Sequence, residues 1–209
     1  MQDGLLPLFP LNVVLLPGAP LPLHIFEERY KEMIGEAIRE NSEFGIVLAT
    51  DKGILNIGCT AVVKEVVRRY ADGRMDILTV GLRRFEIVLL NEEKPYLRGS
   101  VQFFDDESEA AAPEEMRAAA IAAYNQLRRS EGEEEVKAED LDADQLSFRL
   151  AQAVPDHEFR QMMLRMRSET DRMRQLVEFL PFFAARQQRV SHIKHVAKTN
   201  GSGQALPGL

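Results

Sequence analysis

Cysteine and tryptophan are almost absent from this chain of 209 residues, which has one cysteine and no tryptophan. The single cysteine, Cys59, excludes an internal disulfide and any metal site built from several thiolates. Its surroundings have the pattern of a strand without an adjacent base or cation, so we expect a small buried packing residue rather than a reactive thiol. No apolar run reaches the roughly 18 residues that a membrane-spanning helix needs, and we therefore expect no membrane partner.

Sequence patterns of several enzyme classes are also missing. The chain contains no G-x-x-x-x-G-K-[ST] phosphate loop, no G-x-S-x-G nucleophile elbow and no H-E-x-x-H metal helix. A nucleophile, a base and a group that orients them cannot be assembled from the remaining residues. The sequence therefore predicts a protein that is not an enzyme and that needs no cofactor and no metal.

The net charge of −7 is unevenly distributed along the chain. Asp and Glu outnumber Lys and Arg by 14 to 4 in residues 105–144, whereas Lys and Arg prevail by 10 to 5 in residues 145–209. The acidic total argues against a general nucleic-acid binder. The N-terminus lacks the positive charge of a signal peptide, and prolines break the apolar stretch behind it. We therefore expect a cytoplasmic protein.

A proline-studded apolar segment opens the chain, from Leu5 to Leu23. It is too apolar to remain in water and too broken to form one helix. We predict a short buried strand over Val13–Leu16, framed by extended prolyl turns. The helix that follows, Glu27–Glu40, has a single apolar stripe and two glutamates in its first turn.

Short β-rich runs follow that helix, each bounded by turn residues. They are Phe44–Thr50, Ile57–Arg69, Arg74–Gly81, Arg84–Leu90 and Tyr96–Phe104. The pair Asp72-Gly73 is the strongest hairpin signal in the chain. Such strands must close or be covered to protect their edges. We therefore predict an α+β fold: a small β-barrel or curled, antiparallel-leaning sheet with one helix over residues 1–105, followed by an α-helical bundle subdomain.

From Asp105 onward the composition changes from strand-like to helical. We predict an acidic linker over residues 106–112 and a helical subdomain over residues 113–198. Within the subdomain, residues 130–144 are acidic and poor in large apolar groups, which predicts a loop. The Gly- and Pro-containing residues 199–209 predict a disordered tail.

Capping residues indicate where the predicted helices begin. Pro113 suits the first position of one helix, Asp144 can cap a second, and Asp156 can cap a third. The sequence Ser168-Glu169-Thr170-Asp171 resembles a capping box and opens a long helix. Pro181 should kink or interrupt that helix.

Seven segments of the sequence occur in a characteristic order: LPLFPLNVVLLPGAPLPLHIFEERYKEMI, FGIVLA, IGCTAVVKEV, ADGRMDILTVGLRRFEI and PYLRGSVQFFDDE, and in the helical half LSFRLAQAV and MLRMRSETDRMRQLVEFL. Their succession resembles the N-terminal domain of Lon proteases, a module related in fold to PUA domains. The resemblance extends from Leu5 to about Val190. The ATPase and Ser/Lys protease segments of Lon proteases have no counterpart here, so the resemblance implies a stand-alone, PUA-like module for substrate recognition.

The function that this resemblance implies is binding of unfolded or damaged polypeptide segments in a shallow apolar groove with a polar rim. The protein would then act as an adaptor or modulator of ATP-dependent proteolysis, with a full-length Lon-type protease as partner, or as a free holdase. The alternative is an RNA-binding module, because PUA-related folds often contact RNA. Its support is the basic helical half and two doublets, Arg68-Arg69 and Arg83-Arg84, although such doublets are more commonly solvated strand ends.

Two groups of residues are candidates for contact with a peptide. They are His24, Phe26, Arg29 and Tyr30 near the first helix, and Met162, Met163 and Met166 in the helical half. Methionine is flexible and polarisable, so a methionine-lined surface adapts to many apolar sequences, but the same spacing fits an ordinary buried stripe. His24 can instead fix the turn before the helix by a hydrogen bond, and Arg29 can pair locally.

His192 and His195 are three residues apart and could share a helical face as a metal pair. They lie in a basic segment without a nearby carboxylate, which favours a solvated helix end. We expect no metal at this pair.

Overall fold

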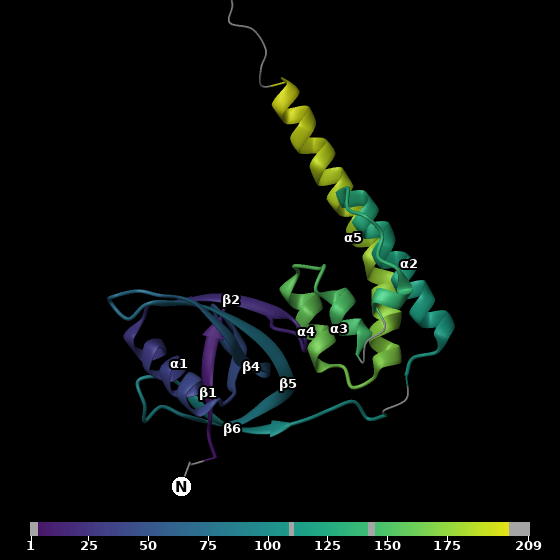
Figure 1. Ribbon diagram of the computed structural model, residues 1–209. Helices are drawn as coiled ribbons and strands as arrows, with labels where there is room; N and C mark the ends of the chain where they lie inside the picture. Colours follow the sequence, from purple (N-terminus) through teal and green to yellow (C-terminus); the bar gives the residue numbers. More distant parts are fainter. Residues whose placement is uncertain (1–3, 109–110, 142–144, 201–209) are drawn as a thin grey trace, which may run out of the picture. The chain divides into compact units, whose positions relative to one another are not determined.

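The computed structural model describes residues 4–108, 111–141 and 145–200, and the side chains of residues 138 and 190–200 lie outside this description. The chain divides into two units, Met1–Ala110 with Gln145–Glu169, and Ala111–Asp144 with Thr170–Leu209 (Figure 1). The elements of the first unit are β1 (Leu6–Leu11), β2 (Pro20–Ile25), α1 (Glu28–Glu40), β3 (Phe44–Thr50), β4 (Gly53–Arg69), β5 (Met75–Asn91), β6 (Arg98–Phe103), α3 (Leu146–Ala151) and α4 (His157–Arg165). The second unit holds α2 (Glu114–Glu131), the 3-10 helix η1 (Ala138–Leu141) and nearly all of α5 (Glu169–Asn200).

The strands form one mixed sheet that closes on itself. Their order is β2-β5-β4-β3-β1-β6, and β6 also pairs with β5, so β5, β4, β3, β1 and β6 form a closed ring. Only the β1–β3 pair is parallel among the described pairings. Closure removes the exposed edges of these strands. The predicted α+β class, with a small barrel and a helix, is confirmed.

The predicted strand over Val13–Leu16 is wrong, because the strands lie on either side of it. Four of the five prolines in the apolar segment Leu5–Leu23 lie inside β1 and β2, and Pro17 lies in the turn between them. β2 has a single neighbour, so prolines without an N–H are tolerated there. Val13–Leu16 is an irregular connection whose last three side chains are buried. It crosses β5 at Gly81, where a Cβ would lie 2.3 Å from the Leu16 carbonyl oxygen.

The β4–β5 hairpin turns at the predicted position. Tyr70 N–H donates to the Arg74 carbonyl, and Gly73 has a φ of 83° that favours glycine. The two runs predicted on either side of Gly81 are one continuous strand, β5. Its register against β4 shifts between Cys59 and Ala61, so a bulge bends the strand without ending it.

Large apolar side chains fill the barrel and pack under α1. Leu8, Val47 and Phe85 form a fully buried cluster inside the barrel. On α1, Tyr30, Met33, Ile34 and Ala37 are buried, which is the apolar stripe expected from the spacing. Phe9 of β1 stacks on the ring of Tyr30, with centroids 4.0 Å apart.

The helices after residue 113 do not all belong to one unit. α3 and α4 group with the sheet, so the observed division differs from the predicted subdomain 113–198 in residues 145–169. Asp156 caps α4 as predicted, since its Oδ1 accepts a hydrogen bond from Phe159 N–H at 2.9 Å. α3 begins after Gln145, and the predicted cap Asp144 lies outside the described residues.

In the second unit, α2 begins behind Pro113 and α5 contains Pro181. Of the predicted kink or interruption at Pro181, the interruption does not occur, because α5 is continuous through this residue. Leu180, Phe183 and Ala184 beside it are buried. The predicted acidic loop contains η1, and Asn125 of α2 holds it by hydrogen bonds to the backbone of Val136.

Some expectations fall on residues that are not described. The side chains of His192 and His195 lie outside the description, as do residues 201–209 of the predicted tail. Within the described part of the chain, no helix combines the length and apolar character needed to cross a bilayer.

Candidate functional site

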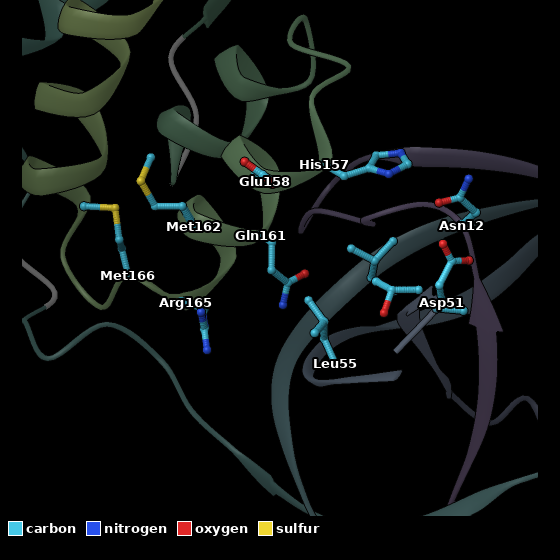
Figure 2. Close-up of a pocket in the computed structure, with 12 residues that line it drawn as sticks. Asn12, Asp51, Leu55, His157, Glu158, Gln161, Met162, Arg165 and Met166 are labelled. Carbon is cyan, nitrogen blue, oxygen red and sulfur yellow. The ribbon is translucent and has the colours of Figure 1, made fainter. Parts of the chain in front are cut away.

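A groove separates α4 from one end of the barrel, and both of its walls belong to the first unit (Figure 2). Its volume is about 1060 Å³. The lining residues are Asn12, Leu48, Ala49, Thr50, Asp51 and Leu55 on the barrel side, and His157, Glu158, Gln161, Met162, Arg165 and Met166 on the helix side. A volume of this size suits a ligand as large as a short peptide segment.

The barrel wall is built where β3 turns into β4. Thr50 Oγ1 donates to the Gly53 carbonyl at 2.9 Å and accepts from Lys52 N–H at 3.2 Å. Gly53 has a φ of 114°, which only glycine adopts readily. These contacts fix the turn, so Asp51 and Leu55 are presented to the groove by a rigid support.

The helical period of α4 determines which of its residues face the groove. Phe159, Met163 and Leu164 are buried and anchor the helix in the unit. The groove-lining positions 158, 161, 162 and 165 are spaced three and four apart, so they share the opposite face. The same period that buries one face therefore presents a mixed polar and apolar face to the groove.

Arg84 of β5 fixes the C-terminal end of this helix wall. Its guanidinium donates to the Met166 carbonyl at 2.5 Å and to Asp106 Oδ1 at 2.6 Å. The guanidinium carbon also lies 4.9 Å from the ring centroid of Phe104 and 5.3 Å from that of Phe148. The Arg84 and Asp106 side chains are 2% and 12% exposed, so this ion pair is nearly excluded from water.

Gln161 provides a polar group on the floor of the groove. Its Nε2 donates to the Ile57 carbonyl of β4 at 3.0 Å, which sets the amide orientation because the reverse would bring two oxygens together. Its Oε1 is buried and has no hydrogen-bond partner among the described residues. An unsatisfied buried acceptor typically costs about 1–3 kcal/mol. Figure 2 shows this side chain pointing from α4 toward Leu55 on the barrel.

Three charged side chains of the groove make no ion pair with any residue that the structure describes. They are Asp51 on the barrel wall, Glu158 in the first turn of α4 and Arg165 at its last residue. All three are exposed. They are therefore available to a charged partner.

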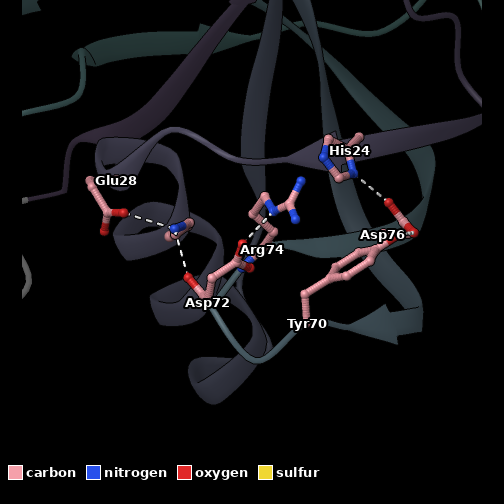
Figure 3. Close-up of polar contacts among 7 residues, drawn as sticks. His24, Glu28, Tyr70, Asp72, Arg74 and Asp76 are labelled. Carbon is pink, nitrogen blue, oxygen red and sulfur yellow. Dashed lines mark hydrogen bonds and ion pairs between the residues drawn. The ribbon is translucent and has the colours of Figure 1, made fainter.

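The candidates near the first helix lie away from the groove, and one of them, His24, belongs to a group of surface hydrogen bonds (Figure 3). His24 Nδ1 lies 2.6 Å from Asp76 Oδ1, and Tyr70 Oη donates to Asp76 Oδ2 at 2.7 Å. The hydrogen bonds from His24 and then Tyr70 hold the pKa of Asp76 below its ordinary value. Lys31 donates to the Asp72 carbonyl at 3.0 Å, which ties α1 to the same hairpin.

The other three candidates near the first helix differ in how exposed their side chains are. Phe26 is 58% exposed, whereas Tyr30 is buried under the sheet. Arg29 pairs locally with Glu27, with its Nη2 2.8 Å from Oε2. Neither His24 nor these three residues line the groove.

Of the three candidate methionines, two line the groove. Met162 is 36% exposed, Met166 is partly buried, and Met163 is completely buried. Gln161, Arg165 and the residues of the barrel wall are not among the predicted contact residues. No local pattern identifies Gln161, because its partner Ile57 is 104 residues away in the chain.

A closed barrel with a helix-lined groove places the first unit in the α+β class. The family model of the ATP-dependent protease La (LON) substrate-binding domain matches residues 5–181. The chain therefore belongs to this family. Every residue that lines the groove lies within the matched range.

Individual relatives and solved structures agree with the family. The chain is 34% identical over 109 residues to the Lon protease of Parabacteroides distasonis, which covers 48% of this chain and 13% of that protein. It is 29% identical over 113 residues to the Lon protease of Anaeromyxobacter dehalogenans, covering 50% and 13%. This chain thus matches only a small part of the length of these curated relatives.

Two solved structures share the fold. A Lon N-terminal domain protein from Xanthomonas campestris is 26% identical with a TM-score of 0.66, covering 83% of this chain and 97% of that chain. The N-terminal domain of the Mycobacterium avium complex Lon protease is 20% identical with a TM-score of 0.62, covering 85% and 98%. The second likeness concerns the fold alone.

Proposed function

We propose that this protein binds extended segments of unfolded or damaged polypeptides in the groove between α4 and the barrel, without catalysing a reaction. The observation that carries the proposal is the groove itself, within a chain of the Lon substrate-binding family. Both of its walls belong to one unit, so the groove does not depend on how the two units are placed.

The lining suits sequence-tolerant binding. Met162 and Met166 offer flexible thioether side chains that adapt to different apolar groups, and Leu48 and Leu55 face them from the barrel. Polar groups at the rim keep the groove soluble when it is empty. Affinity in such a groove comes from burial of apolar area and not from one fixed residue.

Membership of the Lon substrate-binding family supports a role in proteolysis. A module that holds unfolded segments can deliver them to a Lon-type protease or compete with the protease for them. We propose such an adaptor or modulator role, with a Lon-type protease as the partner. The RNA-binding alternative has less support in the groove, since Asp51 and Glu158 there would repel phosphate groups.

Fluorescence anisotropy with a labelled, reduced and carboxymethylated protein that cannot refold tests the binding, with the native form of that protein as the control. The unfolded chain should bind and the native form should not. Replacing a partly exposed Met162 by serine should weaken binding about threefold to tenfold, from lost apolar burial.

The matched control is Leu89→Ser, which removes a 69% exposed apolar side chain of β5 that does not line the groove. It should leave affinity unchanged. Equal binding of native and unfolded chains, or an equal loss in both variants, would contradict the proposal. Retention of RNA in place of polypeptide would support the alternative.

A further inference from the structure

The groove is polarised along the axis of α4. Glu158 lies in the first turn of the helix and Arg165 is its last residue. Seven residues of α-helix span about 10 Å. In Figure 2, Asp51 lies toward His157 at the N-terminal end of α4, whereas Arg165 lies toward Met166. The first turn of α4 and the barrel turn at Asp51 therefore carry carboxylates, and the C-terminal end of α4 carries a guanidinium.

The lining also includes apolar side chains and one buried acceptor. Met162 on the helix and Leu55 on the barrel supply apolar surface, and Gln161 Oε1 is a buried acceptor without a partner among the described residues. The Gln161 side chain is held by its bond to Ile57, so its orientation is set before a ligand arrives. An extended peptide carries a backbone N–H that can satisfy such an acceptor.

We propose that the groove selects extended segments in which two apolar residues stand between a basic and an acidic residue, and that Gln161 Oε1 accepts a backbone N–H of the segment. This inference rests on the proposed polypeptide binding and specifies its ligand. Residues i and i+3 of an extended chain are about 10 Å apart, which matches the span from Glu158 to Arg165. The basic residue faces Glu158 and Asp51, and the acidic residue faces Arg165.

Four labelled peptides with a common Ser/Gly frame test the charge pattern: Lys-Leu-Phe-Glu, Glu-Leu-Phe-Lys, Lys-Leu-Phe-Lys and Glu-Leu-Phe-Glu. At low salt the tighter of the two mixed-charge peptides should bind wild-type protein about threefold to tenfold better than either like-charge peptide. High salt should compress this difference, because exposed charges are screened.

A charge-reversal variant tests whether the preference among the peptides arises in the groove. Arg165→Glu makes both ends acidic, so the peptide with two lysines should become the tightest ligand. Arg149→Glu is the matched control, since Arg149 is exposed on α3 and does not line the groove, and it changes the net charge equally. It should preserve the wild-type order of the four peptides.

The role of Gln161 is tested by a double-mutant cycle. The tighter mixed-charge peptide is N-methylated at the Leu or at the Phe amide, which removes one N–H. One of these methylations should weaken binding to wild-type protein about threefold to tenfold and should have no such effect on Gln161→Met. Thermal unfolding of Gln161→Met checks that the variant is folded. The Arg165→Glu variant tests the charge pattern of the peptide independently of Gln161→Met.

The possible outcomes distinguish the selectivity for a charge pattern from the polypeptide binding on which it rests. If the unfolded protein binds but the four peptides bind equally or not at all, the charge pattern is refuted and the proposed function stands. If methylation effects are the same in wild type and Gln161→Met, the role of Gln161 is refuted. If neither the unfolded protein nor any peptide binds, the proposed function fails.

Discussion

Arg84 on β5 and Met166 at the end of α4 are joined by a hydrogen bond of 2.5 Å from the guanidinium to the backbone carbonyl. Their separation in the sequence is 82 residues, so this contact connects the barrel to the helix that forms the other wall of the groove. The same guanidinium neutralises Asp106. This nearly buried guanidinium therefore helps to hold the C-terminal end of α4 against the barrel.

Replacing Arg84 by methionine should destabilise the first unit by about 3–5 kcal/mol, because it removes the nearly buried guanidinium that pairs with Asp106 and donates to the Met166 carbonyl. Urea unfolding followed by circular dichroism measures this. The neighbouring Arg83→Met is the control: its side chain is 53% exposed and pairs with Glu43 at the surface, so its loss should cost about 1 kcal/mol or less. Comparable losses in both variants would show that the buried pair does not hold α4.

Gly58 of β4 should tolerate no side chain, because a Cβ there would lie 2.4 Å from the Ile46 carbonyl oxygen and 2.6 Å from Phe85 Cζ. Gly58→Ala should lower the free energy of unfolding by about 1–3 kcal/mol or more, since neither backbone nor a packed ring can yield easily. Gly35→Ala in α1 is the matched control, because its Cβ meets nothing within 4 Å. It should raise stability by about 0.5–1 kcal/mol through helix propensity. Chemical denaturation of both variants checks the opposite signs.

Periodicity and turn chemistry predicted the elements that depend on local sequence. β3 spans Phe44–Thr50 as expected, α1 begins one residue after the predicted start, and the hairpin turns at Asp72-Gly73. The strand predicted at Val13–Leu16 is wrong because prolines lie inside the strands on both sides of it, β1 and β2. In β2 they are tolerated because that strand has a single neighbour, which the sequence does not reveal.

The site was less predictable than the elements. Met162 and Met163 are adjacent and chemically identical, yet one lines the groove and the other is completely buried. The helical phase that separates them is fixed by packing against the barrel. Asp51, which faces α4, belongs to a turn more than a hundred residues away in the chain. Only the closed barrel brings such residues together.

Asp76 should contribute stability that depends on pH. Its pKa is held below the ordinary value of 3.8 by hydrogen bonds from His24 and Tyr70, so the folded state binds its proton less readily than the unfolded state. The contribution is therefore complete above pH 3.8 and is lost as the pH falls through the folded-state pKa. The difference in unfolding free energy between wild type and Asp76→Asn should shrink over that window, as measured by urea unfolding at pH 7, 5 and 3.

Asp51→Asn is the control, since Asp51 pairs with no described residue. The difference in unfolding free energy between wild type and Asp51→Asn should stay small at all three pH values. A constant gap for Asp76→Asn would contradict the assignment.

Cys59 should be inert in the folded protein. The side chain is fully buried in β4, and burial raises the pKa of its thiol to about 12. Thiolate, the reactive form, is therefore scarce, and reagent reaches the sulfur only when the barrel opens. Reaction of the folded protein with Ellman's reagent at pH 8 should be slower than reaction of the protein in urea by on the order of a thousandfold or more, since opening of the core requires most of the unfolding free energy.

A Cys59→Ala protein carrying Leu89→Cys is the control, because position 89 is exposed on β5. The thiol at position 89 should react at nearly the same rate with and without urea. Rapid labelling of native wild-type protein would mean that the barrel around Cys59 opens readily in the folded state.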